Sequence, residues 1–243
     1  MPDALRLAFT TLTVLPIRGG RVDRQVAGGA MFLAPFVGAL LGLILAGVHW
    51  LLPAGLLGAA LTVTLGVLLT RGLHLDGLAD TIDALGSYRR GNEALEIMKK
   101  PDIGPFGVAA IALALLLQTA ALTETGPGPW AVVAAWTTGR LAVTLTCRHG
   151  IPAARPEGLG ALVAETVSRP KTAAATLLTL AVAIPAVPDR PWAGPAAAAL
   201  ATLAVVLLLR HAVRRFGGMT GDIIGANVEL ATTLTVVALA MLA

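Results

Sequence analysis

Three aspartates occur within eight positions of one short stretch, GLHLDGLADTIDAL, at Asp76, Asp80 and Asp83. At about 100° per residue, these positions lie within roughly 60° of one another on a helix. No lysine or arginine lies between Arg71 and Arg89, so pairs along the helix cannot neutralise the three carboxylates. A divalent metal can neutralise them, and hard oxygen ligands without thiolates favour Mg²⁺ or Mn²⁺. Because protein-bound Mg²⁺ usually also takes substrate phosphates, the pattern indicates a phosphate or diphosphate substrate.

A simpler interpretation is a solvated acidic helix end, in which the helix dipole favours Asp76. That interpretation explains one aspartate but not three on one face between apolar runs. His74, two residues before Asp76, is interpreted as a ligand, a base or a polar interface residue, and the sequence leaves these roles open.

A second polar segment, LEIMKKPDIGPFG, spans residues 95–107. Pro101 predicts a helix end after Lys99 and Lys100. The two lysines are interpreted either as a phosphate clamp facing the metal or as interfacial residues with a Glu96–Lys100 surface pair.

A third segment, RRFGGMTGDIIGAN, spans residues 214–227. Gly217 and Gly218 predict a flexible turn that presents Thr220 or Asp222 as the N-cap of a following helix. Exposed N–H groups at such a start can bind phosphate.

Further polar residues lie on or near these segments. Arg148 and Arg155 belong to the polar loop RHGIPAARPEGLG. Asn227 and Glu229 lie about one turn inside the last apolar run, where an unpaired glutamate is costly.

The composition is that of a membrane protein. The 243 residues are 56% hydrophobic and 13% charged, with a mean hydropathy of +0.79, which is too apolar for a soluble surface. Seven runs approach the length of about 20 residues that crosses a bilayer. They are residues 29–52, 55–72, 105–123, 130–147, 173–188, 193–213 and 226–243. We therefore expect an all-α, polytopic membrane protein with about seven transmembrane helices, forming one domain over residues 1–243.

The basic residues predict the orientation. With the N-terminus in the cytoplasm, 17 of the 18 lysines and arginines lie on cytoplasmic segments or beside them, and Arg190 alone lies outside. This asymmetry follows the positive-inside rule and puts the C-terminus outside. It explains the net charge of +4 without nucleic acid. The polar segments then all face the cytoplasm, as would an active site.

Five pieces of the sequence resemble the cobalamin (cobamide) synthase family of adenosylcobinamide-GDP ribazoletransferases. They are LTVLPI, GLHLDGLADTIDAL, LEIMKKPDIGPFG, the run from Arg148 to EGLG, and GGMTGDIIGANVEL, in the family's order from end to end of the chain. One departure is that the family's usual K-D-S-R-I-G reads K-K-P-D-I-G from Lys99, so the roles of Lys100 and Asp102 stay open.

The resemblance implies a transferase of a substituted phosphate group, in the last step of nucleotide-loop assembly of adenosylcobalamin. α-Ribazole, or its 5′-phosphate, attacks the cobinamide-side phosphorus of adenosylcobinamide-GDP at the inner membrane, GMP leaves, and Mg²⁺ is required. The expected metal ligands are Asp76 and Asp80, with Asp83 as a third ligand or as the base. His74 and Asp222 are further candidate catalytic residues. The candidate substrate-binding residues are Lys99, Arg148, Arg155, Gly217, Gly218, Thr220 and Asn227.

Other classes fit less well. A CDP-alcohol phosphotransferase shares Asp76-Gly77-Leu78-Ala79 only partly in register and needs a downstream aspartate tail that the chain lacks. A polyprenyl-diphosphate transferase needs a second aspartate-rich motif. A cation-coupled transporter predicts acids near mid-span. The lower-base preference and the oligomeric state stay open.

Overall fold

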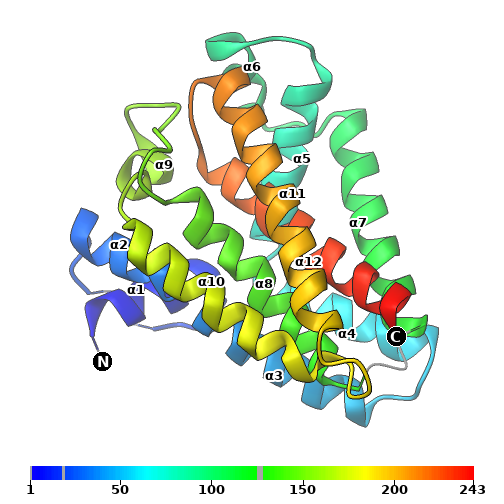
Figure 1. Cartoon of the computed structure of the whole chain (residues 1–243). Coiled ribbons are helices and arrows are strands. Elements are labelled where there is room, and N and C mark those ends of the chain that lie inside the picture. The colour runs from blue at the N-terminus through cyan, green and yellow to red at the C-terminus, as the bar shows by residue number, and fades with distance from the viewer. Residues whose placement is uncertain (1, 18–19, 125–127) are drawn as a thin grey trace.

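The structure is a computed structural model and describes residues 2–17, 20–124 and 128–243. In this part of the chain all regular elements are helical (Figure 1). The helices are α1 (Asp3–Leu12), α2 (Arg24–Phe32), α3 (Ala34–Leu51), α4 (Leu56–Leu69), α5 (Leu73–Gly86), α6 (Gly91–Ile97), α7 (Pro105–Glu124), α8 (Trp130–Thr146), α9 (Gly158–Val163), α10 (Arg169–Ala183), the short 3₁₀ helix η1 (Ile184–Ala186), α11 (Ala193–Phe216) and α12 (Gly221–Leu242).

Each of the seven predicted apolar runs overlaps a helix, although α10 and α12 begin four or five residues before their predicted runs. Among the described residues, α3, α7, α11 and α12 are long and apolar enough to cross a membrane, and α4 and α5 are so only as a pair bent by 88°. Helices α8 and α10 have 17 and 15 residues, fewer than the roughly 20 of a typical span. The all-α, multi-pass membrane architecture is thus confirmed, whereas the count of seven spans and the orientation of the termini stay predictions.

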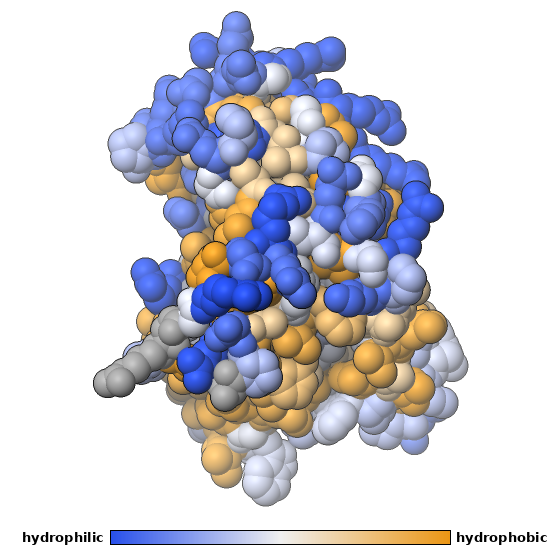
Figure 2. Space-filling view, turned by 90° about the vertical axis from the view of Figure 1, so that its left-hand side faces the viewer, coloured by the Kyte–Doolittle hydropathy of each residue, from blue (hydrophilic) through white to orange (hydrophobic). Residues whose placement is uncertain are grey.

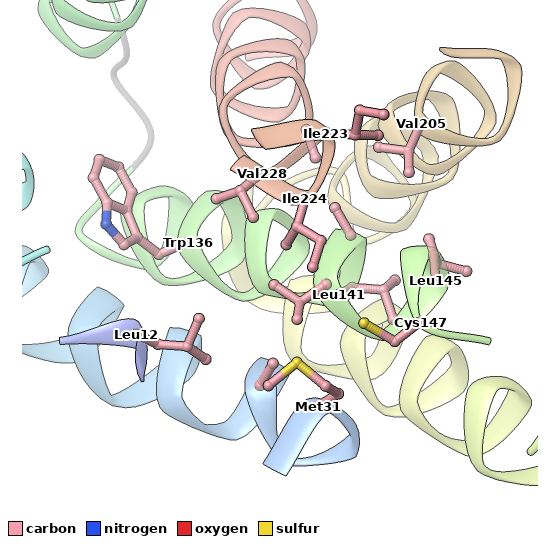
Figure 3. Close-up of a cluster of buried hydrophobic side chains, with 14 of the residues drawn as sticks. Leu12, Met31, Trp136, Leu141, Leu145, Cys147, Val205, Ile223, Ile224 and Val228 are labelled. Carbon is pink, nitrogen blue, oxygen red and sulfur yellow. The ribbon is translucent and has the colours of Figure 1, made fainter. Parts of the chain in front are cut away.

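Helix α8 runs through the middle of the bundle, against α3, α10, α11 and α12 (Figure 1). Every side chain from Ala131 to Thr146 on it is buried. Figure 3 shows Leu141 and Leu145 of α8 among side chains from the surrounding helices, including Met31, Val205 and Ile224. Its threonines satisfy their hydroxyl groups without water, because several of them donate to the carbonyl four residues earlier, as Thr137 does to Val133 at 2.7 Å.

Two glycines let α5 and α12 cross closely. A Cβ on Gly77 would lie 2.7 Å from the carbonyl oxygen of Asp222, and one on Gly225 would lie 3.1 Å from the carbonyl oxygen of His74. The crossing therefore brings the middle of α5 against the first turns of α12. Helix α5 also packs on α7 near its start, where a Cβ on Gly107 would touch Ala79. Helix α5 thus lies across the ends of two spans, outside their apolar middle.

One end of the molecule is polar. Hydrophilic side chains gather over the upper part of the face in Figure 2, at the height at which Figure 1 shows α6 and α9, and hydrophobic side chains gather below. This is the end at which α5 meets the start of α12.

Candidate functional site

Four carboxylates form one cluster between α5 and α12. Burial, followed by the charges of Asp222, Asp76 and Asp83 in that order, raises the pKa of Asp80 to about 7. The predicted helix over the three aspartates is confirmed as α5. The fold adds Asp222 from the first turn of α12. Mutual repulsion of this kind marks a place where a cation would be stabilised.

Within the described ranges, no arginine or lysine forms an ion pair with this cluster. Among the described residues the ion pairs are Arg21–Asp23 and Lys99–Glu96, both on the surface. Arg155 lowers the pKa of Asp80 by a smaller effect than the burial and the neighbouring carboxylates. Its guanidinium donates to the carbonyl of Leu95, and its buried Nε has no partner in the part of the chain that the structure describes. Arg155 is therefore a cation near the carboxylate cluster that can still donate a hydrogen bond.

Asp83 has a different environment from its neighbours. Its Oδ2 accepts from the Gly104 N–H at 2.7 Å and its Oδ1 from the Gly107 N–H at 2.9 Å. These are amides at the start of α7, which have no partner within that helix. The contacts favour a structural role for Asp83 in fixing α7 against α5, and its predicted role as metal ligand or base stays a prediction.

Beside the cluster, two loops pack closely and are joined by backbone hydrogen bonds. Gly217 ends α11 with φ of +86°, and a Cβ on Gly218 would lie 2.5 Å from the backbone of Ala153 and Ala154. Met219 N donates to Pro152 O at 2.8 Å, and Ala154 N donates to Met219 O at 2.9 Å. This pairing brings the loop of Arg155 to the start of α12. The two glycines thus act through the backbone, and neither lines the cavities described next.

Of the two N-cap candidates that the sequence offered, Thr220 and Asp222, it is Thr220 that caps α12. Its Oγ1 accepts from the Ile223 N–H at 3.2 Å and donates to Asp222 Oδ2 at 3.2 Å. The cap therefore fixes the orientation of the Asp222 carboxylate.

Three cavities meet at the cluster and share Leu159 as a wall. The first cavity, of about 180 Å³, is lined by Arg155, Glu157 and Asp222 with the start of α12. The second cavity, of about 230 Å³, lies between Asp76 and Asp222 and includes His74. The third cavity, of about 680 Å³, extends from Asp76 to Arg71 and the threonines of α1. Asp222 borders the first and second, and Asp76 the second and third, so neighbouring cavities share a carboxylate, and we call the three together the trough.

Three predicted substrate-binding residues lie elsewhere. Lys99 is exposed and pairs with Glu96 at 2.9 Å, so the predicted Glu96–Lys100 surface pair is replaced by a Glu96–Lys99 pair. Arg148 follows α8, where burial and then Arg210 lower its pKa. Asn227 is fully buried, and its amide donates to Thr146 at 3.3 Å. The structure does not bring these three residues to the trough.

Glu229 has the partner that its position inside an apolar helix requires. Its Oε2 accepts from Gln118 Nε2 at 2.9 Å, and the same amide donates to Thr233. Arg140 of α8 lines the same small cavity. This polar group lies deeper than the carboxylate cluster and supports the packing of α7, α8 and α12.

The donor set fits Mg²⁺, although no three histidine, cysteine, aspartate or glutamate side chains converge as a ready metal site in the described ranges. Mg²⁺ usually takes one or two carboxylates and completes its shell with water and substrate phosphates. Asp76 and Asp80, one turn apart on α5, could supply those carboxylates. Their repulsion without a paired cation is the observation that favours a metal here.

Sequence reasoning did not single out several lining residues, among them Glu157 and Leu159. Glu157 lines the first cavity and Leu159 all three. Both belong to EGLG, one of the pieces that carry the family resemblance, but neither residue has a type or spacing that predicts its place.

The chain is similar along nearly its whole length to one group of enzymes. The family model described as cobalamin-5-phosphate synthase matches residues 4–240. The adenosylcobinamide-GDP ribazoletransferase of Frankia casuarinae is 45% identical, over 97% of this chain and 94% of the relative. Enzymes of the same name from Nocardioides sp. and Pseudomonas syringae are 39% and 37% identical, over 98% and 97% of this chain and 98% of each relative. No solved structure matches the chain.

Proposed function

This chain belongs to the cobalamin-5-phosphate synthase family, and we propose that it transfers adenosylcobinamide phosphate from adenosylcobinamide-GDP to α-ribazole or its 5′-phosphate, releasing GMP. The observation that carries the proposal is the meeting of Asp222 from α12 with Asp76 and Asp80 from α5, beside Arg155 and open to a trough. Carboxylates for a metal, a cation for phosphate oxygens and a helix N-terminus are what a diphosphate displacement needs.

Each group has a role in this reaction. Asp76 and Asp80 would hold Mg²⁺, which when bound offsets negative charge on the diphosphate. Arg155 and the first N–H groups of α12 line the first cavity and bind phosphate oxygens there. Asp222, oriented by Thr220, accepts the proton of the attacking ribose hydroxyl, which is one that is free in both α-ribazole and its 5′-phosphate. A bond forms between that oxygen and the cobinamide-side phosphorus, the bond from this phosphorus to GMP breaks, and GMP leaves with the bridging oxygen.

The position of the site suits a membrane enzyme with water-soluble nucleotides. The cluster lies at the polar end of the molecule, near the ends of α7 and α12 rather than at mid-span. With the positive-inside rule this supports a cytoplasmic site at the inner membrane. Acids at the edge of the apolar region do not favour an ion relay through the bilayer.

The test is GMP release by the purified protein in lipid nanodiscs, with adenosylcobinamide-GDP, α-ribazole and Mg²⁺. We expect Mg²⁺-dependent release that Asp80→Asn lowers by roughly 10²–10³-fold, the scale of losing one electrostatic group at a reacting centre. Asp189→Asn, at an exposed position far from the cluster along the chain, is the matched control and should keep wild-type rates. Undiminished release by a well-folded Asp80→Asn protein would overturn the metal assignment, and no release by the wild type would overturn the function.

A further inference from the structure

The second cavity has an apolar wall with a single buried polar side chain. Its volume is about 230 Å³, and it reaches from the carboxylate cluster into the core. The large apolar side chains come from six helices and are Leu12, Met31, Leu73, Val143, Leu159 and Ile224. Figure 3 shows Ile224 on one side of α8 and Met31 and Leu12 on the other. Asp76 and Asp222 also line the cavity.

His74 is the polar side chain of this wall. It is 3% exposed, and its Nδ1 has no hydrogen-bond partner among the described residues. An imidazole ring carries at least one N–H donor in either charge state. A buried polar atom without a partner is costly and calls for an explanation. A ligand that offers one acceptor would supply the missing partner.

We propose that the second cavity holds the dimethylbenzimidazole ring of α-ribazole, and that His74 donates a hydrogen bond to the unsubstituted ring nitrogen of that base. The inference rests on the proposed function and deepens it, because it assigns the acceptor substrate a place. It makes His74 a specificity-determining residue of the acceptor site.

The size and polarity of the cavity favour this base over the other parts of the substrates. Pockets for drug-sized ligands measure roughly 300–1,000 Å³, so a cavity of about 230 Å³ suits a two-ring base and excludes a corrin. Guanine has donors and acceptors around both rings, and those that lie against the apolar side chains of the wall would stay unpaired. Dimethylbenzimidazole has one free acceptor, which His74 can pair, and two methyl groups, which the apolar side chains of the wall can contact.

The same placement orders the reaction. With the base against His74, the ribose lies towards Asp76 and Asp222, which line the cavity with it. A free ribose hydroxyl then meets Asp222, which also borders the first cavity with Arg155. Acceptor and leaving nucleotide thus occupy different cavities on either side of the carboxylate cluster, as an in-line displacement requires.

The test is equilibrium binding of two unmethylated α-ribosides to the protein in nanodiscs. Benzimidazole riboside keeps the acceptor nitrogen, and indole riboside replaces it with a carbon. The wild type should bind benzimidazole riboside at least about tenfold more tightly, because a site built to hydrogen-bond a ligand rejects an analogue that lacks the group. His74→Leu should bring the two dissociation constants within about twofold of each other.

The control is His49→Leu, since His49 hydrogen-bonds Thr62 through Nδ1 at the far end of α3. It should keep the tenfold preference. Val143→Ile provides a second variant that does not depend on His74. An added methylene on the wall should weaken binding of the dimethylated riboside about tenfold and that of the unmethylated one much less.

The outcomes separate the inference from the function. GMP release from α-ribazole by a wild type that shows no preference between the ribosides overturns the inference alone. A preference that survives His74→Leu, or equal effects of Val143→Ile on both ribosides, also overturns it. No GMP release by the wild type overturns the proposed function.

Discussion

Asp80 lies among three other carboxylates, whose charges raise its pKa. Among the described residues, Arg155 is the cation that offsets this effect, and it does so only in small part. A solvated surface aspartate would not be arranged in this way, because like charges at short range destabilise the folded state. At neutral pH this arrangement costs the least free energy when a divalent cation or a proton is bound to the carboxylates.

The pH dependence of metal binding follows from this carboxyl. Since its pKa is about 7 without metal, Mg²⁺ must displace a proton below that pH. We expect the apparent Mg²⁺ affinity, measured by calorimetry in nanodiscs, to fall up to about tenfold per pH unit below 7 and to level off above it. Asp80→Asn should remove the dependence. An affinity that stays constant across pH 7 in the wild type would contradict this assignment.

The stability of the metal-free protein should show the opposite trend. A folded-state pKa of about 7 against an ordinary value of 3.8 means that the folded protein binds more protons than the unfolded chain between these pH values. Its stability therefore decreases as the pH rises through that window.

Residue types predicted part of the site and not the rest. Helical spacing placed Asp76, Asp80 and Asp83 on one face, but it could not distinguish Asp83, whose oxygens accept from the start of α7. That difference depends on residues more than 20 positions away along the chain. Thr220 as the cap of α12 is confirmed because capping is a local interaction.

At the scale of elements, the site depends on the crossing of α5 and α12. The sequence predicted both helices but not their contact, since the two are separated by more than 130 residues. Gly77 and Gly225 are the only sequence feature that we connect with this contact. They do not predict it, because glycines are common in membrane helices that make no such crossing. Hydropathy also could not predict the bend of 88° between α4 and α5, because a hydropathy profile carries no information about the angle between neighbouring helices.

Gly77→Ala tests the crossing. The new Cβ would lie 2.7 Å from the Asp222 carbonyl oxygen, so α5 and α12 must separate, at a cost of about 1–3 kcal/mol. We expect a lower midpoint of thermal unfolding in nanodiscs and a loss of GMP release larger than the stability loss alone produces. Gly47→Ala is the matched control, because a Cβ there meets nothing within 4 Å and alanine favours a helix. Equal behaviour of the two variants would show that the crossing does not set the site.

At the scale of the whole molecule, the apolar composition predicted a multi-pass helical protein, and the helices confirm it. The sequence alone could not reveal that α8 is enclosed by other helices, because a helix buried in protein and one facing lipid have the same hydropathy. The polar end in Figure 2 agrees with the predicted concentration of basic residues on one side.

The orientation is tested by single cysteines in whole cells. The native Cys147 is buried, so it should give little background with a membrane-impermeant maleimide. Asp189→Cys should be labelled in intact cells, since its segment is predicted to lie outside. Asn92→Cys, exposed in α6, should be labelled only after the membrane is opened. The reverse pattern would place the carboxylate cluster outside the cytoplasm.

The most direct measurement of the central claim is electron paramagnetic resonance of Mn²⁺ bound to the protein with adenosylcobinamide-GDP. We predict one Mn²⁺ per chain, with hyperfine coupling to ³¹P of the diphosphate, and loss of this signal in Asp80→Asn but not in Asp189→Asn. A wild-type protein that binds the nucleotide without Mn²⁺–³¹P coupling, or a signal unchanged by Asp80→Asn, would contradict a metal held by the α5 carboxylates.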